Sequence, residues 1–170
     1  MPSPAIGESS TKSLGADFSV PIDDRYFEDY QPGASYEYGH IEITEDDIIE
    51  FATRYDPQPI HIDRDWARTG PFGGLIASGW HTSALCMRMY VDHYLSRVAG
   101  LASPGIDELR FAVPTRPGDV LRARFTVIEA RPSRSKPDRG ILFTRMEGFN
   151  QNDELAMSAI GMNMVARRPE

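Results

Sequence analysis

A carboxylate and an imidazole stand five residues apart in the segment Asp56–Asp63, as Asp56 and His61. Histidine titrates near neutrality and can orient a neighbouring carboxylate, so such a pair can take a proton from water and return it to a substrate. Pro57 and Pro59 disfavour a helix here and restrict the backbone, which would hold both side chains toward one small space. The pair therefore indicates proton transfer, and it suits the addition or elimination of water.

The residues alone leave a second interpretation open. Asp-Pro is a common turn former, so Asp56 could simply cap a turn and His61 could be an ordinary buried histidine. An aspartate and a histidine this close together also occur by chance in many loops.

Regular elements are expected on both sides of this segment. The alternation of aromatic and aliphatic residues predicts a strand over 35–43. Thr44 and the acids after it predict a helix start, and the helix would deliver Asp56 at its end. Helical spacing predicts that this helix buries one face, made of Ile48, Phe51, Ala52 and Tyr55.

The rest of the chain predicts one long helix and four strands. Residues 63–68 favour a short helix or turn, and 70–74 must form a loop. The helix expected from Ser78 or Gly79 to about Ser96 is apolar on most faces, so other elements must wrap it. Strands are expected at about 105–113, 120–130, 141–150 and 155–166. Together these elements predict an α+β domain whose antiparallel sheet curls around one helix.

Two stretches near the site carry a family resemblance. Tyr55–Asp63 and Pro71–Trp80 resemble the MaoC-like dehydratases, which are R-specific enoyl-CoA hydratases of the hot-dog fold. Gly105–Phe111 and Pro114–Leu121 resemble the strand and turn that follow the central helix in that family. The similarity is colinear over roughly 35–166, which is far more specific than a lone motif. It implies a single hot-dog domain, an antiparallel sheet wrapped around a long central helix.

The resemblance also implies a reaction and its residues. Water would add reversibly to a trans-2-enoyl-CoA thioester to give the (R)-3-hydroxyacyl thioester. Asp56 matches the general acid/base and His61 the partner that orients the same water. The backbone N–H of Gly79, at the start of the central helix, matches the donor to the thioester oxygen, with Ser78 beside it in the expected substrate-binding site.

The chain departs from the family pattern at a few positions. Tyr55 stands before the Asp where Gly is usual, and Gln58 stands where Asn is usual, which moves the side-chain amide outward by one methylene. Ser78-Gly79 replaces a frequent His-Gly pair, and the serine hydroxyl could cap the helix.

The other histidines and the single cysteine are weaker candidates. His81 is a rival for the imidazole role, whereas His40 and His93 are expected at the surface or in packing. Cys86 lies in an apolar run and is expected in the core. Their spacing does not predict a zinc site, so no metal is expected, and no cofactor is expected beyond the coenzyme A carried by the substrate.

Composition limits the possible partners. The chain has 170 residues and a formal net charge of −7, which argues against nucleic acid or an anionic membrane surface as the main partner. No apolar run approaches the length of a membrane span, and the N-terminus shows no secretory signal. A single cysteine cannot form an internal disulfide, which agrees with the reducing cytoplasm. A disordered lead-in is expected over 1–17, with the domain over 18–170.

Coenzyme A phosphates need a local basic patch. Residues 131–139 form the only dense basic run, although a run of this kind is more often a solvated hairpin loop. Arg64 and Arg68 are comparable candidates. A small sheet around one helix leaves edges exposed, so a homodimer or a dimer of dimers is expected, with the acyl pocket between subunits as in the resembled family. Two alternatives stay open, a hot-dog acyl-CoA thioesterase and a non-catalytic acyl-CoA-binding protein.

Overall fold

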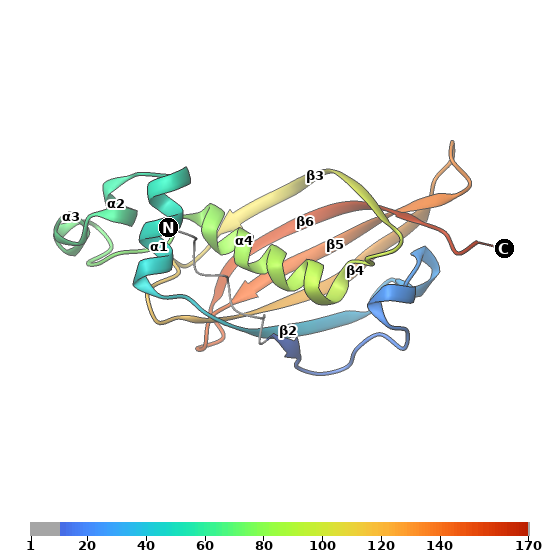
Figure 1. Ribbon diagram of the computed structural model, residues 1–170, viewed down its shortest axis with the longest axis horizontal. Helices are drawn as coiled ribbons and strands as arrows, with labels where there is room; N and C mark the ends of the chain where they lie inside the picture. Colours follow the sequence, from blue (N-terminus) through green and yellow to red (C-terminus); the bar gives the residue numbers. More distant parts are fainter. Residues whose placement is uncertain (1–10, 170) are drawn as a thin grey trace, which may run out of the picture.

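A computed structural model describes residues 11–169, and within them one sheet of six antiparallel strands lies against one long helix (Figure 1). The strands lie in the order β1-β2-β4-β5-β6-β3. Their bounds are β1 Lys12–Ser13, β2 Ser35–Glu42, β3 Gly100–Phe111, β4 Val120–Pro132, β5 Arg139–Phe149 and β6 Leu155–Ala166. The long helix is α4 (Gly79–Met89), which continues as the π-helical turn η3 (Tyr90–Tyr94). This is the hot-dog architecture that the sequence predicts.

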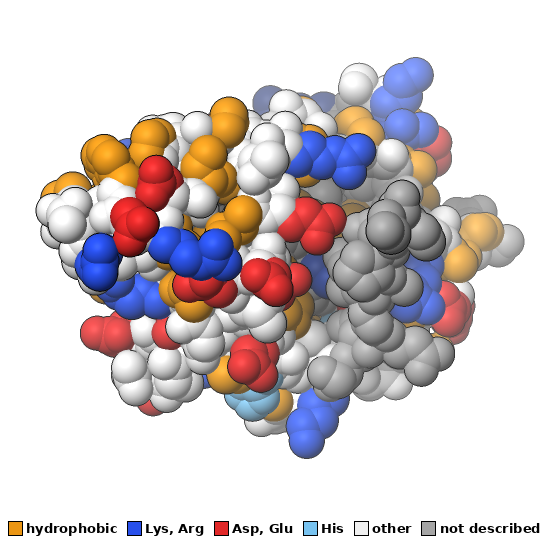
Figure 2. Space-filling view, turned by 60° about the vertical axis from the view of Figure 1, so that its left-hand side comes forward, with side chains coloured by type: hydrophobic (Ala, Val, Ile, Leu, Met, Phe, Trp, Pro, Cys, Tyr) orange, Lys and Arg blue, Asp and Glu red, His pale blue; other side chains and the backbone are white. Residues whose placement is uncertain are grey.

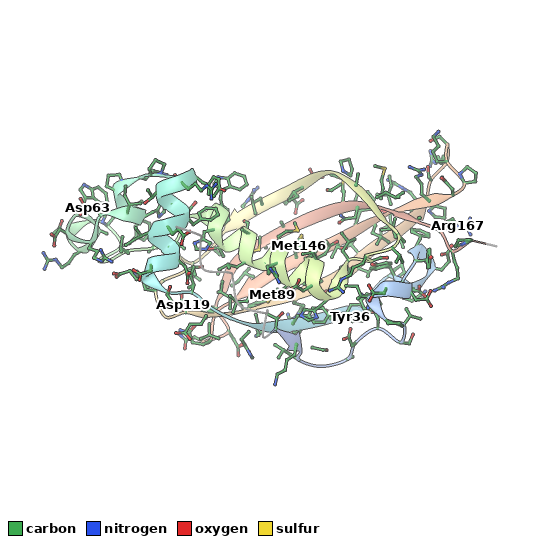
Figure 3. The ribbon with its side chains drawn as sticks, viewed as in Figure 1. Tyr36, Asp63, Met89, Asp119, Met146 and Arg167 are labelled. Atoms are coloured by element: carbon green, nitrogen blue, oxygen red, sulfur yellow. The ribbon has the colours of Figure 1, made fainter. Side chains whose placement is uncertain are left out.

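Strand β4 shows why the sheet has one covered face. Its side chains alternate, and the inward set is fully buried against the long helix: Leu121, Ala123, Phe125 and Val127. On the other face Arg122 and Arg124 form ion pairs with Glu37 of the neighbouring β2, at 2.9 and 2.6 Å. The period-two alternation in the sequence therefore places one face of β4 in the core and the other toward solvent. Met89 of α4 and Met146 of β5, both labelled in Figure 3, belong to the buried core.

Helix α1 (Glu45–Tyr55) begins and ends as the sequence predicts. Thr44 accepts a hydrogen bond from the Asp47 N–H, and the Asp47 carboxylate accepts one from the Thr44 N–H. Ile48 and Ala52 are fully buried. The prediction that Tyr55 belongs to the buried face is wrong, since it is 64% exposed. It lies on the last turn, where its ring packs on the Phe51 ring from the solvent side.

The expectation that the two prolines exclude a helix after Asp56 is also wrong. Pro59–Ile62 forms a single helical turn, α2, with Pro59 at its first position. Proline is well suited to that position because its missing N–H has no helical partner there. The predicted short helix follows as α3 (Arg64–Thr69), and the Asp63 carboxylate caps it by accepting from the N–H groups of Asp65 and Trp66.

Helix α4 is covered on one side. Thr82, Cys86 and Met89 are buried against the sheet. We expected other elements to wrap this helix on most of its faces. Within a single chain that expectation is wrong. An apolar stripe at helical spacing remains exposed, made of Trp80, Ala84, Met87 and Val91.

The amino-terminal segment is ordered earlier than expected. Residues 1–10 of the expected disordered lead-in lie outside the described residues. Lys12–Ser13 pairs with β2, and Asp17 accepts a hydrogen bond from the Tyr38 hydroxyl at 2.7 Å. The described part of 1–17 is therefore attached to the sheet rather than disordered. Two short 3-10 helices follow, η1 (Ile22–Asp24) and η2 (Phe27–Asp29).

Residues from this amino-terminal region close the carboxyl end of the long helix. The buried guanidinium of Arg25 donates to the carbonyl oxygens of His93 and Tyr94 at 2.8 and 2.7 Å. The Tyr30 hydroxyl also donates to the Tyr94 carbonyl, at 3.0 Å. The last carbonyls of the helix thus have partners, as helix termini require. Among the described residues no helix is long and apolar enough to cross a membrane.

Candidate active site

Asp56 and His61 lie together where three elements meet. Asp56 is the C-cap of α1, His61 lies in α2, and the N-cap of α4, Ser78, lies beside them. The His61 Nε2 is 3.5 Å from the Asp56 Oδ2, with side chains 8% and 20% exposed. That separation is longer than a good hydrogen bond, so the two groups face one another without being fully bonded.

The orientation of His61 fixes which nitrogen faces Asp56. Its Nδ1 lies 2.8 Å from the carbonyl oxygen of Ile76. A carbonyl only accepts, so Nδ1 carries a hydrogen. In the Nδ1–H tautomer the ring presents the Nε2 lone pair to Asp56, and two acceptors then face one another. A water molecule can donate one O–H to each of them and keep its lone pairs free for a substrate.

Two donors hold the Asp56 carboxylate from opposite sides. The Ser78 hydroxyl donates to Oδ2 and the Gln58 amide donates to Oδ1, both at 2.7 Å. These bonds, with the Ser78 bond contributing most, lower the pKa of Asp56 below its ordinary value, and the nearby His61 acts in the same direction. Asp56 is therefore held as a carboxylate, the form that can accept a proton.

Ser78, which is expected beside Gly79 in the substrate-binding site, contacts Asp56 in this structure. Its Oγ accepts a hydrogen bond from the Trp80 N–H at 3.2 Å, as an N-cap does. Its one hydroxyl hydrogen goes to Asp56. The side chain is 1% exposed, so in this structure it positions the carboxylate.

Gly79 opens the first turn of α4 beside a cavity of about 250 Å³. Its N–H is one of those that a helix start leaves without a helical partner. A Cβ at this position would collide with the Phe111 ring, so only glycine lets that ring lie against the backbone. The cavity is lined by His61, Phe72, Ile76, Ala77, Gly79, Thr82, Phe111, Ala112, Val113, Pro114, Thr115 and Ala156. The catalytic candidate His61 and the candidate donor Gly79 thus border the same space.

The rival histidine faces away from that pair. His81 is 7% exposed, stacks on the Phe51 ring with centroids 4.4 Å apart, and does not line the cavity. Burial lowers its pKa. His40 is exposed, and His93 packs on the Tyr38 ring, as predicted for a surface and a packing residue.

Cys86 is fully buried, as predicted, and burial raises the pKa of its thiol to about 12. In the described part of the chain, no three His, Cys, Asp or Glu side chains come together as a metal-binding group.

The basic candidates for coenzyme A phosphates are not gathered at the site. The loop between β4 and β5, which holds the basic run, lies at the opposite end of the molecule from α1 to α3 (Figure 1). Arg64 forms ion pairs with Glu45 and Asp46, and Arg68 with Asp65. Figure 2 shows basic and acidic side chains interspersed on the face that it presents.

The sequence missed several contributors to the site. Arg116 donates to the Phe72 carbonyl at 2.9 Å and is next to Thr115, which lines the cavity. The spacing of these residues in the sequence does not reveal this contact. The bond between Ser78 and Asp56 joins residues 22 positions apart. The Ile76 carbonyl that orients His61 carries no side-chain signal at all.

Comparison with known proteins agrees with this geometry. A family model described as the MaoC-like domain matches residues 29–141. A 3-hydroxybutyryl-CoA dehydratase of Methylorubrum extorquens is 33% identical over 118 residues, 65% of this chain and 69% of that protein. An (R)-specific enoyl-CoA hydratase of Rhodospirillum rubrum is 33% identical over 116 residues, 64% and 74% of the two chains. The crystal structure of a MaoC-like dehydratase from Rhodospirillum rubrum superposes with a TM-score of 0.80 at 37% identity, covering 86% of this chain and 99% of that one.

Proposed function

The chain belongs to the MaoC-like dehydratase family, and we propose that it adds water reversibly to a trans-2-enoyl-CoA thioester to give the (R)-3-hydroxyacyl-CoA. The names of two relatives, a 3-hydroxybutyryl-CoA dehydratase and an (R)-specific enoyl-CoA hydratase, support this reaction. The observation that carries the proposal is the pair of acceptors on Asp56 and His61, 3.5 Å apart, near the Gly79 N–H. The chemistry needs no cofactor besides the coenzyme A of the substrate.

The first step uses the water between the two acceptors. One water O–H donates to Asp56 Oδ2 and the other to His61 Nε2, so the oxygen lone pair is aimed at the β-carbon of the enoyl group. As the new C–O bond forms, the pair removes one water proton. A positioned acid/base contributes about 10²–10⁴ in rate.

The second step places negative charge on the thioester oxygen. The electron pair of the double bond moves through the conjugated system to that oxygen, where the Gly79 N–H and the partial positive charge of the helix start stabilise it. The proton held by the Asp56 and His61 pair then returns to the α-carbon. Water has added across the double bond, and the reverse sequence eliminates it.

Pairing with a second copy of this chain is part of the proposal. β3 is the outer strand of the sheet next to β6, so one of its backbone edges is unpaired within the described chain. Large apolar side chains on β3, α4 and η3 are 36–63% exposed: Trp80, Met87, Val91, Leu101, Ile106 and Phe111. Two copies related by a twofold axis would cover both features, so we expect at least a dimer.

Coenzyme A enters, on this proposal, from the side of the cavity that Arg116 borders. The Arg116 guanidinium contacts the Phe72 carbonyl, and the described residues show no carboxylate paired with it. It is therefore better placed than Arg64 or Arg68, whose charges are already paired, to meet a phosphate.

The experiment that tests the function measures two products at once. Purified protein is incubated with a panel of trans-2-enoyl-CoA thioesters, and loss of the enoyl chromophore and release of free thiol are recorded together. We expect chromophore loss without thiol release, and an R configuration of the product. Thiol release would instead identify a thioesterase, and binding with neither signal would identify an acyl-CoA-binding protein.

A further inference from the structure

A second cavity lies further along the long helix. It has a volume of about 340 Å³ and is lined by Met87, Tyr90, Leu95, Ser96, Gly100, Leu101, Ala102, Ser103, Ile106, Met146, Gly161 and Asn163. It is larger than the cavity beside His61. None of its lining residues belongs to the reacting groups, and three of them, Met87, Leu101 and Ile106, are among the exposed apolar side chains that the proposed second copy would cover.

Both cavities are bordered by the same elements in the same direction. Along α4 and η3 the lining passes from Gly79 and Thr82 to Met87 and Tyr90. Along β3 it passes from Phe111 back to Ile106 and Gly100, and along β6 from Ala156 to Gly161 and Asn163. The two cavities therefore follow one another between the long helix and the β3 side of the sheet.

The distance between the two cavities can be estimated from the rise of the long helix. Gly79 and Met87 are eight residues apart, which is about 12 Å at the rise of an α-helix. An extended hydrocarbon chain with bonds of about 1.5 Å advances about 1.25 Å per carbon. An acyl chain of about ten carbons, with its thioester oxygen at Gly79, would reach the second cavity.

The Tyr90 hydroxyl holds the side-chain amide of Asn163 at the inner wall. It donates to Asn163 Oδ1 at 2.7 Å, and its ring stacks on that of Tyr94, with centroids 4.8 Å apart. The Asn163 oxygen is thus occupied, and no described residue accepts a hydrogen bond from its Nδ2. Asn163 therefore offers hydrogen-bond donors at a wall that is otherwise mostly apolar.

The charge of the lining decides what kind of acceptor fits. No Lys, Arg or His is among the residues that line this cavity. A carboxylate would lose water there without gaining a cation, whereas a neutral carbonyl or hydroxyl oxygen needs only the amide donor.

We propose that Asn163 is a specificity-determining residue, and that the substrate is an enoyl thioester of about ten carbons carrying a neutral oxygen acceptor near the far end of its acyl chain. This inference rests on the proposed function. It adds a substrate class to it, because the Asn163 Nδ2 would hydrogen bond to that oxygen.

The test compares thioesters of equal length. Probes are trans-2-decenoyl-CoA, its 9-oxo analogue and an analogue that ends in a carboxylate, each measured for kcat and KM. We expect about a tenfold higher kcat/KM for the 9-oxo compound than for the plain chain, mostly in KM, and no gain for the carboxylate.

Two variants separate recognition from packing. Asn163→Leu removes the donors, and Asn163→Asp keeps an oxygen for the Tyr90 hydroxyl while it also removes them. We expect the preference for the 9-oxo compound to vanish in both. Asn152→Leu, an exposed position in the turn between β5 and β6 that lines neither cavity, should retain it.

Binding of saturated thioesters keeps this test independent of the reaction. Calorimetry with decanoyl-CoA and 9-oxodecanoyl-CoA should show the same tenfold preference in the wild-type protein. Equal affinities, no binding of either, or a preference that survives Asn163→Leu would overturn the proposal. Binding with this preference but no hydration of the enoyl compounds would leave the specificity standing and refute the proposed reaction.

Discussion

The two ends of the long helix are built in opposite ways. At the carboxyl end, Arg25 and Tyr30 donate to the last carbonyls, and aromatic rings pack closely, with Phe18 and Tyr94 centroids 5.6 Å apart. At the amino end, Ser78 caps one N–H and the start of the helix borders a cavity with His61. The backbone groups at the carboxyl end are thus bonded by the chain itself, whereas the amino end borders the cavity of the candidate active site.

This difference indicates that the residues important for stability and those important for catalysis lie at different ends of the long helix. At the carboxyl end the last carbonyls already have donors from the chain itself, so substitutions of those donors should change stability. At the amino end the side chains beside the cavity are proposed to act on the substrate, so substitutions there should change turnover. The following changes test that separation.

His61→Ala should give the largest effect, and it should be on rate. Without the Nε2 acceptor the water loses one of its two partners, so kcat should fall by about 10²–10⁴. The melting temperature should fall by a few degrees at most, because only the Ile76 carbonyl loses its donor. Steady-state hydration assays check this, with His40→Ala at an exposed position as the matched control. Near-normal turnover in His61→Ala would mean that the amino end does not work as described.

Arg25→Leu should give the largest effect on stability. The variant leaves the His93 carbonyl without its donor and the Tyr94 carbonyl with the Tyr30 hydroxyl alone, so the free energy of unfolding should fall by about 1–3 kcal/mol. Urea unfolding measures it, with the 55% exposed Arg97 changed to Leu as the control. The folded fraction should keep its kcat/KM. A large loss of turnover at unchanged stability would contradict the separation of the two ends.

Ser78→Ala should move the pH dependence of the reaction. Ser78 contributes most to lowering the pKa of Asp56, so its removal raises that pKa toward the ordinary value. The reaction needs the ionised carboxylate, so the acid limb of the kcat/KM profile should shift to higher pH. The rate at neutral pH should fall about tenfold. Ser35→Ala, a hydroxyl on an exposed strand position, should leave the profile in place. An unshifted limb in Ser78→Ala would show that the hydroxyl does not tune Asp56.

Gln58→Ala should give the smallest effect, in the same direction. Gln58 also lowers the pKa of Asp56, but it is exposed, and water can replace its amide. We expect a shift of the acid limb smaller than that of Ser78→Ala and a loss of about twofold to threefold in kcat/KM. Profiles of the two variants measured side by side check the order. A larger shift for Gln58 would reverse the assigned ranking.

The sequence predicts the framework well where patterns are local. Period-two alternation located β4, the Thr44 and Asp47 pair located the start of α1, and the family motifs placed Asp56 at its end. Each of these signals depends on residues within a few positions of one another. The helical turn at Pro59 was missed because proline was taken as a helix breaker, although it is suited to a first position.

The rest depends on contacts distant in sequence. β1 has two residues, and only its pairing with β2 defines it. The Ser78 hydroxyl reaches Asp56 across 22 positions, and Phe111 reaches Gly79 across 32. The exposure of Trp80 and Met87 likewise follows from which side of α4 the sheet covers. Composition and periodicity carry none of this information.

The central claim is that the Asp56 carboxylate transfers the proton during hydration. Asp56→Asn keeps the shape of the side chain and removes its charge, and Asp46→Asn, on the same helix with a side chain 96% exposed, is the matched control. Initial rates of trans-2-enoyl-CoA hydration should fall by at least about 10²-fold in Asp56→Asn and stay unchanged in Asp46→Asn, while both variants melt like the wild type. Wild-type rates in a folded Asp56→Asn protein would contradict the account.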